Sequence, residues 1–123
     1  MLRDPAILDR TLTAPERRVL DDLAGRIKER YGEHLDRLQV FGSRARGDVS
    51  DESDIDLLVV LKVPREAEGR ETTAVWDLAE AAMTSQHTAA PISLIVLAEE
   101  SFAELLRRER RFAMDVEAEG IRL

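Results

Sequence analysis

The 123-residue sequence contains no cysteine, only two histidines and few aromatic residues (4%). Without cysteine the chain cannot form a disulfide framework, a thiolate nucleophile, an iron–sulfur cluster or the usual structural zinc sites. The histidines, His34 and His87, lie far apart in the sequence, so a histidine-rich metal site is not expected either. The absence of cysteine is also compatible with a reducing cytoplasm.

The sequence also lacks long apolar runs and a basic stripe. No stretch approaches the ~20 consecutive apolar residues of a membrane span, and Met1–Arg10 lacks the apolar core of a signal peptide. We therefore expect a cytoplasmic protein with no membrane partner. The formal net charge of −7 disfavours broad binding of nucleic acid, and the arginines between Arg107 and Arg111 fit a solvated helix face better than a nucleic-acid patch.

What remains is typical of one folded domain, which we expect to span residues 1–123. Hydrophobic residues make up 44% of the chain, and charges of both signs are interspersed along it. Periodicity predicts helices over 15–31 and 71–84 and from Ser101 onward, and strands over 38–41, 55–61 and 92–97. Thr13 with Glu16, and Ser101 with Glu104, have the spacing of capping boxes, and Gly32 stands where the first helix would end. This order predicts an α/β (α+β) domain.

One segment departs from this generic pattern. The first predicted strand ends at Gly42-Ser43, and a Gly-, Ser-, Asp- and Arg-rich loop then leads to Asp54-Ile55-Asp56 at the start of the second strand. A strand that ends in Gly-Ser and turns into a short helix presents backbone N–H groups and a hydroxyl, which suit a phosphate. Each element alone is common, whereas Gly-Ser, ten residues and Asp-x-Asp together arise by chance on the order of one time in a thousand in such a chain.

The two aspartates predict a metal site. Because side chains alternate along a strand, Asp54 and Asp56 lie on the same face. Two carboxylates held close together repel each other unless a cation lies between them. Mg²⁺ prefers such oxygen ligands and usually completes its shell with substrate phosphates, so a magnesium site is the natural prediction.

With these residues the sequence resembles the minimal nucleotidyltransferases of the polymerase-beta-like superfamily. The family signature is Gly-Ser, a ten-residue spacer and Asp-x-Asp, matched by Gly42, Ser43, Asp54 and Asp56, and the resemblance covers most of the chain. It implies the nucleotidyltransferase fold, a small mixed β-sheet flanked by helices. It also implies Mg²⁺-dependent transfer of a nucleoside monophosphate from an NTP to an acceptor hydroxyl, with release of pyrophosphate.

The resemblance assigns roles to individual residues. Gly42 and Ser43 would hold the triphosphate, while Asp54 and Asp56 would be the catalytic carboxylates that bind two Mg²⁺ ions once the nucleotide is present. Arg44 and Arg46 are candidates for donating hydrogen bonds to phosphate oxygens. For both arginines a solvated loop charge is an equally good interpretation.

The sequence departs from the family pattern at one position. Active members usually add a third carboxylate from the neighbouring strand, but residues 91–97 contain no acid, and Ser93 is the best match for the missing position. The resemblance implies that this loss weakens chemistry more than NTP binding. A substitute could come from the acceptor protein or from Asp48, Asp51, Glu52 or Glu99.

The resemblance further implies an antitoxin that silences a HEPN-domain RNase toxin by moving AMP from ATP to a tyrosine of the toxin. The chain is short, which suggests that acceptor recognition comes from a protein surface. The alternative is a catalytically silent nucleotide-binding module that neutralises its partner by stoichiometric contact. An antibiotic-modifying transferase fits less well, because such enzymes generally need more chain. The nucleobase and a homo-oligomeric state stay open.

Overall fold

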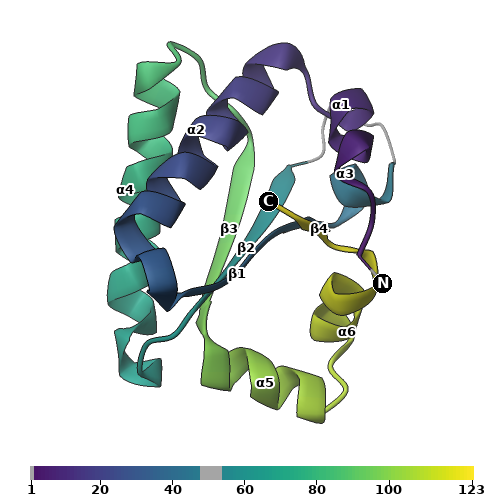
Figure 1. Cartoon of the computed structure of the whole chain (residues 1–123), viewed down its shortest axis with the longest axis vertical. Coiled ribbons are helices and arrows are strands. Elements are labelled where there is room, and N and C mark those ends of the chain that lie inside the picture. Colours follow the sequence, from purple (N-terminus) through teal and green to yellow (C-terminus); the bar gives the residue numbers. More distant parts are fainter. Residues whose placement is uncertain (1, 48–53) are drawn as a thin grey trace.

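The fold is built on a four-stranded mixed sheet in the order β3-β2-β1-β4 (Figure 1). The computed structural model describes residues 2–47 and 54–123. The strands are β1 (Leu35–Phe41), β2 (Ile55–Leu61), β3 (Ile92–Ala98) and β4 (Ile121–Arg122). β1 is antiparallel to both β2 and β4, whereas β2 and β3 are parallel. The predicted α/β class with a small mixed sheet is therefore confirmed.

Six α-helices accompany the sheet in the described part of the chain. They are α1 (Leu8–Thr11), α2 (Ala14–Tyr31), α3 (Ser43–Arg46), α4 (Glu68–Ser85), α5 (Glu99–Arg107) and α6 (Arg111–Glu119). Short 3-10 turns lie at Pro5–Ile7, Gly32–His34 and Arg65–Ala67. None of these helices combines the length and the apolar character that a bilayer crossing requires.

Helices cover both faces of the sheet. The two long helices, α2 and α4, pack side by side on one face, and α5 and α6 lie against the other (Figure 1). β2 is almost completely buried between these layers, as its continuous apolar run predicts. Strand alternation sends Leu57 and Val59 into the α2–α4 layer, and Leu58 and Val60 into the α5–α6 layer.

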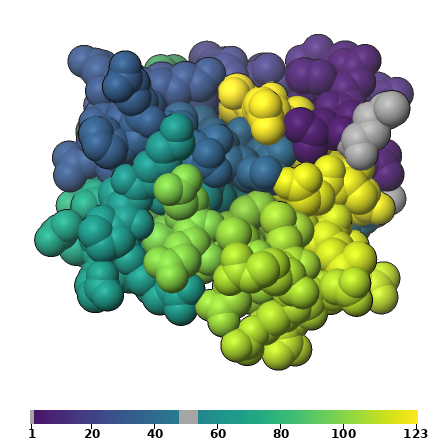
Figure 2. All heavy atoms as spheres, turned by 60° about the horizontal axis from the view of Figure 1, so that its bottom comes forward, coloured from purple at the N-terminus to yellow at the C-terminus, as the bar shows by residue number. Residues whose placement is uncertain are grey.

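The two ends of the described chain meet next to the end of α6. The backbone N–H of Arg3 donates to the carbonyl of Gly120, at 3.0 Å. In the space-filling view the N-terminal segment, in purple, lies against the C-terminal residues, in yellow (Figure 2). β4, which pairs with Gln39 and Val40 of β1, is an element that the sequence pattern did not predict.

The long helix α2 has the capping box and the terminal glycine that the sequence predicts. The Thr13 hydroxyl accepts a hydrogen bond from the backbone of Glu16, at 3.2 Å, and the Glu16 carboxylate accepts one from the backbone of Thr13, at 2.8 Å. These two bonds form a capping box, which satisfies two of the N–H groups that a helix start leaves without partners. Gly32 follows the helix with a φ of +50°, a conformation that glycine adopts readily.

The prediction for the C-terminal helix is partly wrong. α5 begins at Glu99 rather than at Ser101, and its N-cap residue is Ala98, so no capping box forms with Ser101. The helical segment also breaks after Arg107, where Glu109 adopts a φ of +52°, and resumes as α6. The break turns the apolar side of α6 toward β1 and β2, since Ala113 and Val116 are buried with Leu58.

Two aromatic side chains on the helices differ strongly in burial. Phe102 is 3% exposed in the α5–α6 layer, whereas Trp76 on α4 is 39% exposed. The helical spacing of Trp76 in the sequence favours a place in the core, and that expectation is wrong. Its side chain lies on the solvent side of the helix whose Val75 and Ala79 face inward.

This difference predicts unequal costs for two large-to-small substitutions. Phe102→Ala should lower the free energy of unfolding by about 3 kcal/mol, because it leaves a cavity in a packed layer. Trp76→Ala should cost only about 1 kcal/mol, because much of the ring is already in water. Urea unfolding followed by circular dichroism measures both, since the second variant loses its tryptophan signal. Equal costs would contradict the described burial.

Candidate functional site

The candidate site lies where β1 ends and β2 begins. In the antiparallel register Phe41 pairs with Asp56, so Gly42 and Ser43 leave β1 beside the start of β2. β3 runs parallel to β2 and aligns Ser93 with Asp56. The sheet register thus brings the end of one strand and the starts of two others to the same place.

Gly42 and Asp56 approach each other very closely. A Cβ atom built on Gly42 would lie 2.3 Å from Oδ2 of Asp56, well inside van der Waals contact. Gly42 also has a φ of +75°, a conformation that residues with side chains rarely adopt. The positive φ favours glycine here, and any side chain would also displace the Asp56 carboxylate, so the backbone of the Gly-Ser turn lies against a predicted metal ligand.

The electrostatics of Asp56 fit a cation site. Its carboxyl group is half-buried, and its pKa is raised because burial and the neighbouring Asp54 carboxylate both disfavour the charged form, an effect that Arg46 partly offsets. Two carboxylates that repel each other beside a glycine backbone form a donor set that suits Mg²⁺. Asp54 and Asp56 are the residues that could hold it.

A third protein carboxylate does not join them in the described part of the chain. No group of three acidic or histidine side chains gathers there in an arrangement that could hold a metal. Ser93 is the β3 residue level with Asp56. Glu99 follows Ala98, which pairs with Leu61 at the other end of β2, five residues and about 17 Å along the strand from Asp56. Glu99 is therefore wrong as a substitute, while Asp48, Asp51 and Glu52 lie outside the described residues.

The two candidate arginines lie in different surroundings. Arg46 is exposed, pairs with Glu119 of α6 at 3.9 Å, and lies near enough to Asp56 to lower its pKa. Arg44 is only 4% exposed, so the interpretation as a solvated loop charge is wrong for it. Its guanidinium donates to Glu16 and to the carbonyl of Thr11. Sequence reasoning missed Glu16 and Glu119 as partners of this loop because both acids lie far from it in the sequence.

An aromatic pair borders the site. Phe41, the cross-strand neighbour of Asp56, meets Phe112 of α6 edge to face with ring centroids 5.2 Å apart. Both rings are partly buried in the α5–α6 layer, on the face that also carries Asp56 and Ser93. They form an apolar border next to the carboxylates, which helps to explain the desolvation of Asp56.

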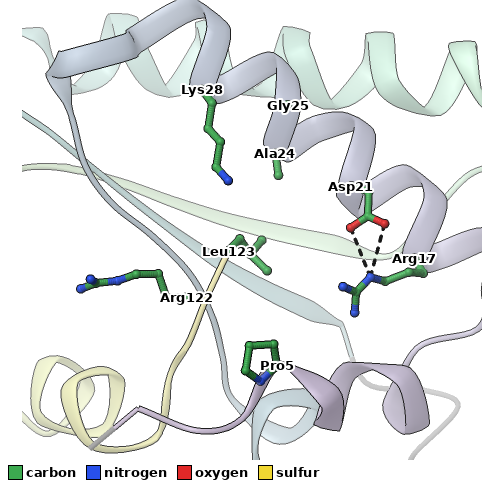
Figure 3. Close-up of a pocket in the computed structure, with 8 residues that line it drawn as sticks. All are labelled: Pro5, Arg17, Asp21, Ala24, Gly25, Lys28, Arg122 and Leu123. Atoms are coloured by element: carbon green, nitrogen blue, oxygen red, sulfur yellow. Dashed lines mark hydrogen bonds and ion pairs between the residues drawn. The ribbon is translucent and has the colours of Figure 1, made fainter.

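A separate hollow of about 370 Å³ lies between α2 and the two chain ends (Figure 3). Lys28 extends into it from α2, and Arg17 bonds to Asp21 on its wall. None of the residues of the candidate site lines this hollow. It therefore offers no competing arrangement of carboxylates and a glycine turn.

This chain is similar to known proteins in its family, in part of its sequence and in its structure. The family described as "Nucleotidyltransferase domain" matches residues 20–115. A Methanocaldococcus jannaschii protein, provisionally named a protein adenylyltransferase, is 38% identical over 45 residues, which are 37% of this chain and 45% of that protein, so the match spans less than half of the relative. A crystal structure of a provisionally named nucleotidyltransferase from Sulfolobus solfataricus aligns with a TM-score of 0.44 and 20% identity over 98% of this chain and 87% of that one.

The approach of Gly42 to Asp56 predicts opposite effects for two glycine substitutions. Gly42→Ala should lower the free energy of unfolding by about 1–3 kcal/mol, because of its positive φ and the clash with Oδ2. Gly25→Ala is the control, because Gly25 lies within α2 and has open space where a Cβ would be. This substitution should raise the free energy of unfolding by about 0.5–1 kcal/mol. Thermal unfolding measures both, and a Gly42→Ala protein as stable as the wild type would contradict the described contact.

Proposed function

Because the chain belongs to the nucleotidyltransferase domain family, we propose that it transfers AMP from ATP to a hydroxyl group of a partner protein, with Mg²⁺ as cofactor. The observation that carries the proposal is the contact between Gly42 and Asp56, which joins the predicted triphosphate turn to the predicted metal ligands. The acceptor oxygen forms a bond to the α-phosphorus, the bond to the β-phosphate oxygen breaks, and pyrophosphate leaves with its electron pair. The acceptor proton passes to solvent.

Each residue of the site has a defined task in this reaction. The backbone of Gly42 and the hydroxyl of Ser43 hold the triphosphate, and Asp54 with Asp56 hold Mg²⁺. Arg46, whose charge already acts on Asp56, also neutralises phosphate charge. When bound, Mg²⁺ neutralises phosphate charge and makes the acceptor hydroxyl more acidic. Catalysis of this kind consists mainly of positioning and charge neutralisation.

A protein acceptor is supported by two observations. The Methanocaldococcus jannaschii relative carries the name of a protein adenylyltransferase. Phe41 and Phe112 form a partly buried apolar border beside the carboxylates, and such a border suits an aromatic acceptor better than a sugar. We propose a tyrosine of a HEPN-domain toxin as the acceptor, so that the protein acts as the antitoxin of a toxin–antitoxin pair.

A second candidate function is neutralisation by binding alone. It is favoured by Ser93, which stands level with Asp56, at the position where the family resemblance implies a third carboxylate in active members. A site with two carboxylates can still bind a nucleotide with its metal. In that case the protein neutralises its partner by stoichiometric contact, and AMP transfer is not needed.

The transfer reaction is tested with ATP labelled in the α-phosphate, Mg²⁺ and the product of the neighbouring gene. We expect label on the partner, and Asp56→Asn should lower the rate about 100-fold or more, because it removes one charged metal ligand. Asp77→Asn, at an exposed position of α4, is the charge-matched control and should leave the rate unchanged.

Two results would separate the candidate functions. Absence of label with wild type and Asp56→Asn alike would contradict the proposed transfer. If Asp56→Asn, still folded, continued to neutralise the partner in cells, binding alone would account for the biology.

Restoring the acidic residue offers an independent prediction. Ser93→Asp should increase Mg²⁺ affinity or the transfer rate by about tenfold, since it adds a carboxylate level with Asp56. Ser101→Asp, on α5, is the control for the added charge. A Mg²⁺ titration of the transfer reaction measures the effect, and unchanged behaviour would show that Ser93 does not occupy the third ligand position.

A further inference from the structure

The buried guanidinium of Arg44 is an unusual feature of a turn for which we propose phosphate binding. Arg44 directly follows Ser43, yet its side chain is 4% exposed. A charged group in such surroundings is costly unless it is paired and hydrogen-bonded. The interactions of Arg44 therefore indicate what its charge does in the fold.

The guanidinium reaches the segment in which α1 ends and α2 begins. Nη1 donates to Oε1 of Glu16 at 2.9 Å and to the carbonyl of Thr11 at 2.7 Å, and Nη2 donates to Oε2 of Glu16 at 3.3 Å. This two-pronged contact is the strongest geometry that an arginine and a carboxylate can form. It joins the turn after β1 to the start of α2.

Glu16 is itself held in place. Its Oε1 also accepts the backbone N–H of Thr13, at 2.8 Å, as part of the capping box. Burial raises the pKa of Glu16, but the hydrogen bonds from Arg44 and Thr13 and the charge of Arg44 outweigh burial, and the pKa lies below its usual value. The carboxylate is thus kept ionised and oriented by the same network that begins α2.

α3 depends on external contacts for its orientation. It is four residues long, too short to be stable by itself, and glycines with positive φ stand on both sides: Gly42 at +75° and Gly47 at +89°. Neither glycine has a side chain that could pack against the fold, so contacts of the residues within α3 must fix its orientation. Arg44 and Ala45 are its two buried residues, and Arg44 provides the charged anchor.

We propose that Arg44 is a positioning residue that acts together with Glu16 and does not contact the nucleotide. The pair fixes α3 so that Gly42 and Ser43 face Asp56, and Arg46 is the arginine that neutralises phosphate charge. This inference rests on the proposed function, because it concerns the triphosphate site. It also gives the capping box of α2 a role in nucleotide binding, although that box lies about 27 residues before the turn.

The test measures binding of inorganic triphosphate and of ATP, each with Mg²⁺, by isothermal titration calorimetry. Glu16→Gln should weaken both affinities about tenfold, since a small displacement of a positioning group is enough to lose binding. Arg44→Met should do the same, and Arg44→Lys should restore part of the loss. The double variant of Glu16→Gln and Arg44→Met should be no weaker than Arg44→Met alone, because the two residues act as one unit.

A matched control separates positioning from loss of charge on α2. Asp21→Asn removes a carboxylate from the same helix, and this carboxylate forms an exposed ion pair with Arg17. Its affinity for triphosphate should equal that of the wild type. All variants are measured at a temperature at which circular dichroism reports the native helix content.

The outcomes distinguish this inference from the proposed function. A wild-type protein that binds neither probe overturns both. Binding by the wild type with equal binding by folded Glu16→Gln and Arg44→Met shows that the pair serves stability alone and overturns the inference only. A loss in Arg44→Met with wild-type binding in Glu16→Gln means that Arg44 contacts the phosphate directly, which also overturns it.

Discussion

The close approach of Gly42 to Asp56 is the constraint on which the site depends. It requires that β1 end opposite the start of β2, and the antiparallel register from Leu35 to Phe41 provides this. The parallel pairing of β2 with β3 then sets Ser93 level with Asp56. A slip of one residue would turn Asp56 from the α5–α6 face to the α2–α4 face, away from Phe41. The pairing of β2 with β1 and β3 thus sets the position of the carboxylate.

The helices around this sheet have two different tasks. α2 and α4 cover one apolar face of the sheet. The first turn of α2 also reaches the Gly-Ser turn, through the contact of Glu16 with Arg44. On the other face α6 contributes Phe112 beside Phe41, and Glu119 near Arg46. The face that carries Asp56 is therefore bordered by residues from the C-terminal part of the chain.

Much of the fold could be predicted from the sequence because its signals are local. The capping box of Thr13 and Glu16, and the β-branched run of β2, involve neighbours in the sequence and were confirmed. The break at Glu109 and the exposure of Trp76 could not be predicted, since both depend on how helices pack against a sheet that the pattern does not describe.

Part of the geometry of the candidate site could also be predicted from the sequence, while its function stays a prediction. The motif identified Gly42 and Asp56 because their spacing is specific, and the structure brings them together. It gave no basis for separating Arg44 from Arg46, which differ by two positions and have the same chemistry. Only the tertiary contact of Arg44 with Glu16, 28 residues earlier in the sequence, distinguishes the surroundings of the two arginines.

The central claim is that a metal-bound triphosphate binds where Gly42 meets Asp56. The most direct measurement is NMR line broadening on titration with ATP and paramagnetic Mn²⁺ in place of Mg²⁺. The account predicts that the backbone amide signals of Gly42, Ser43, Asp56 and Ser93 broaden first and recover when the metal is chelated. Broadening centred instead on the hollow at Lys28 and Arg122, with Gly42 and Asp56 unaffected, would contradict it.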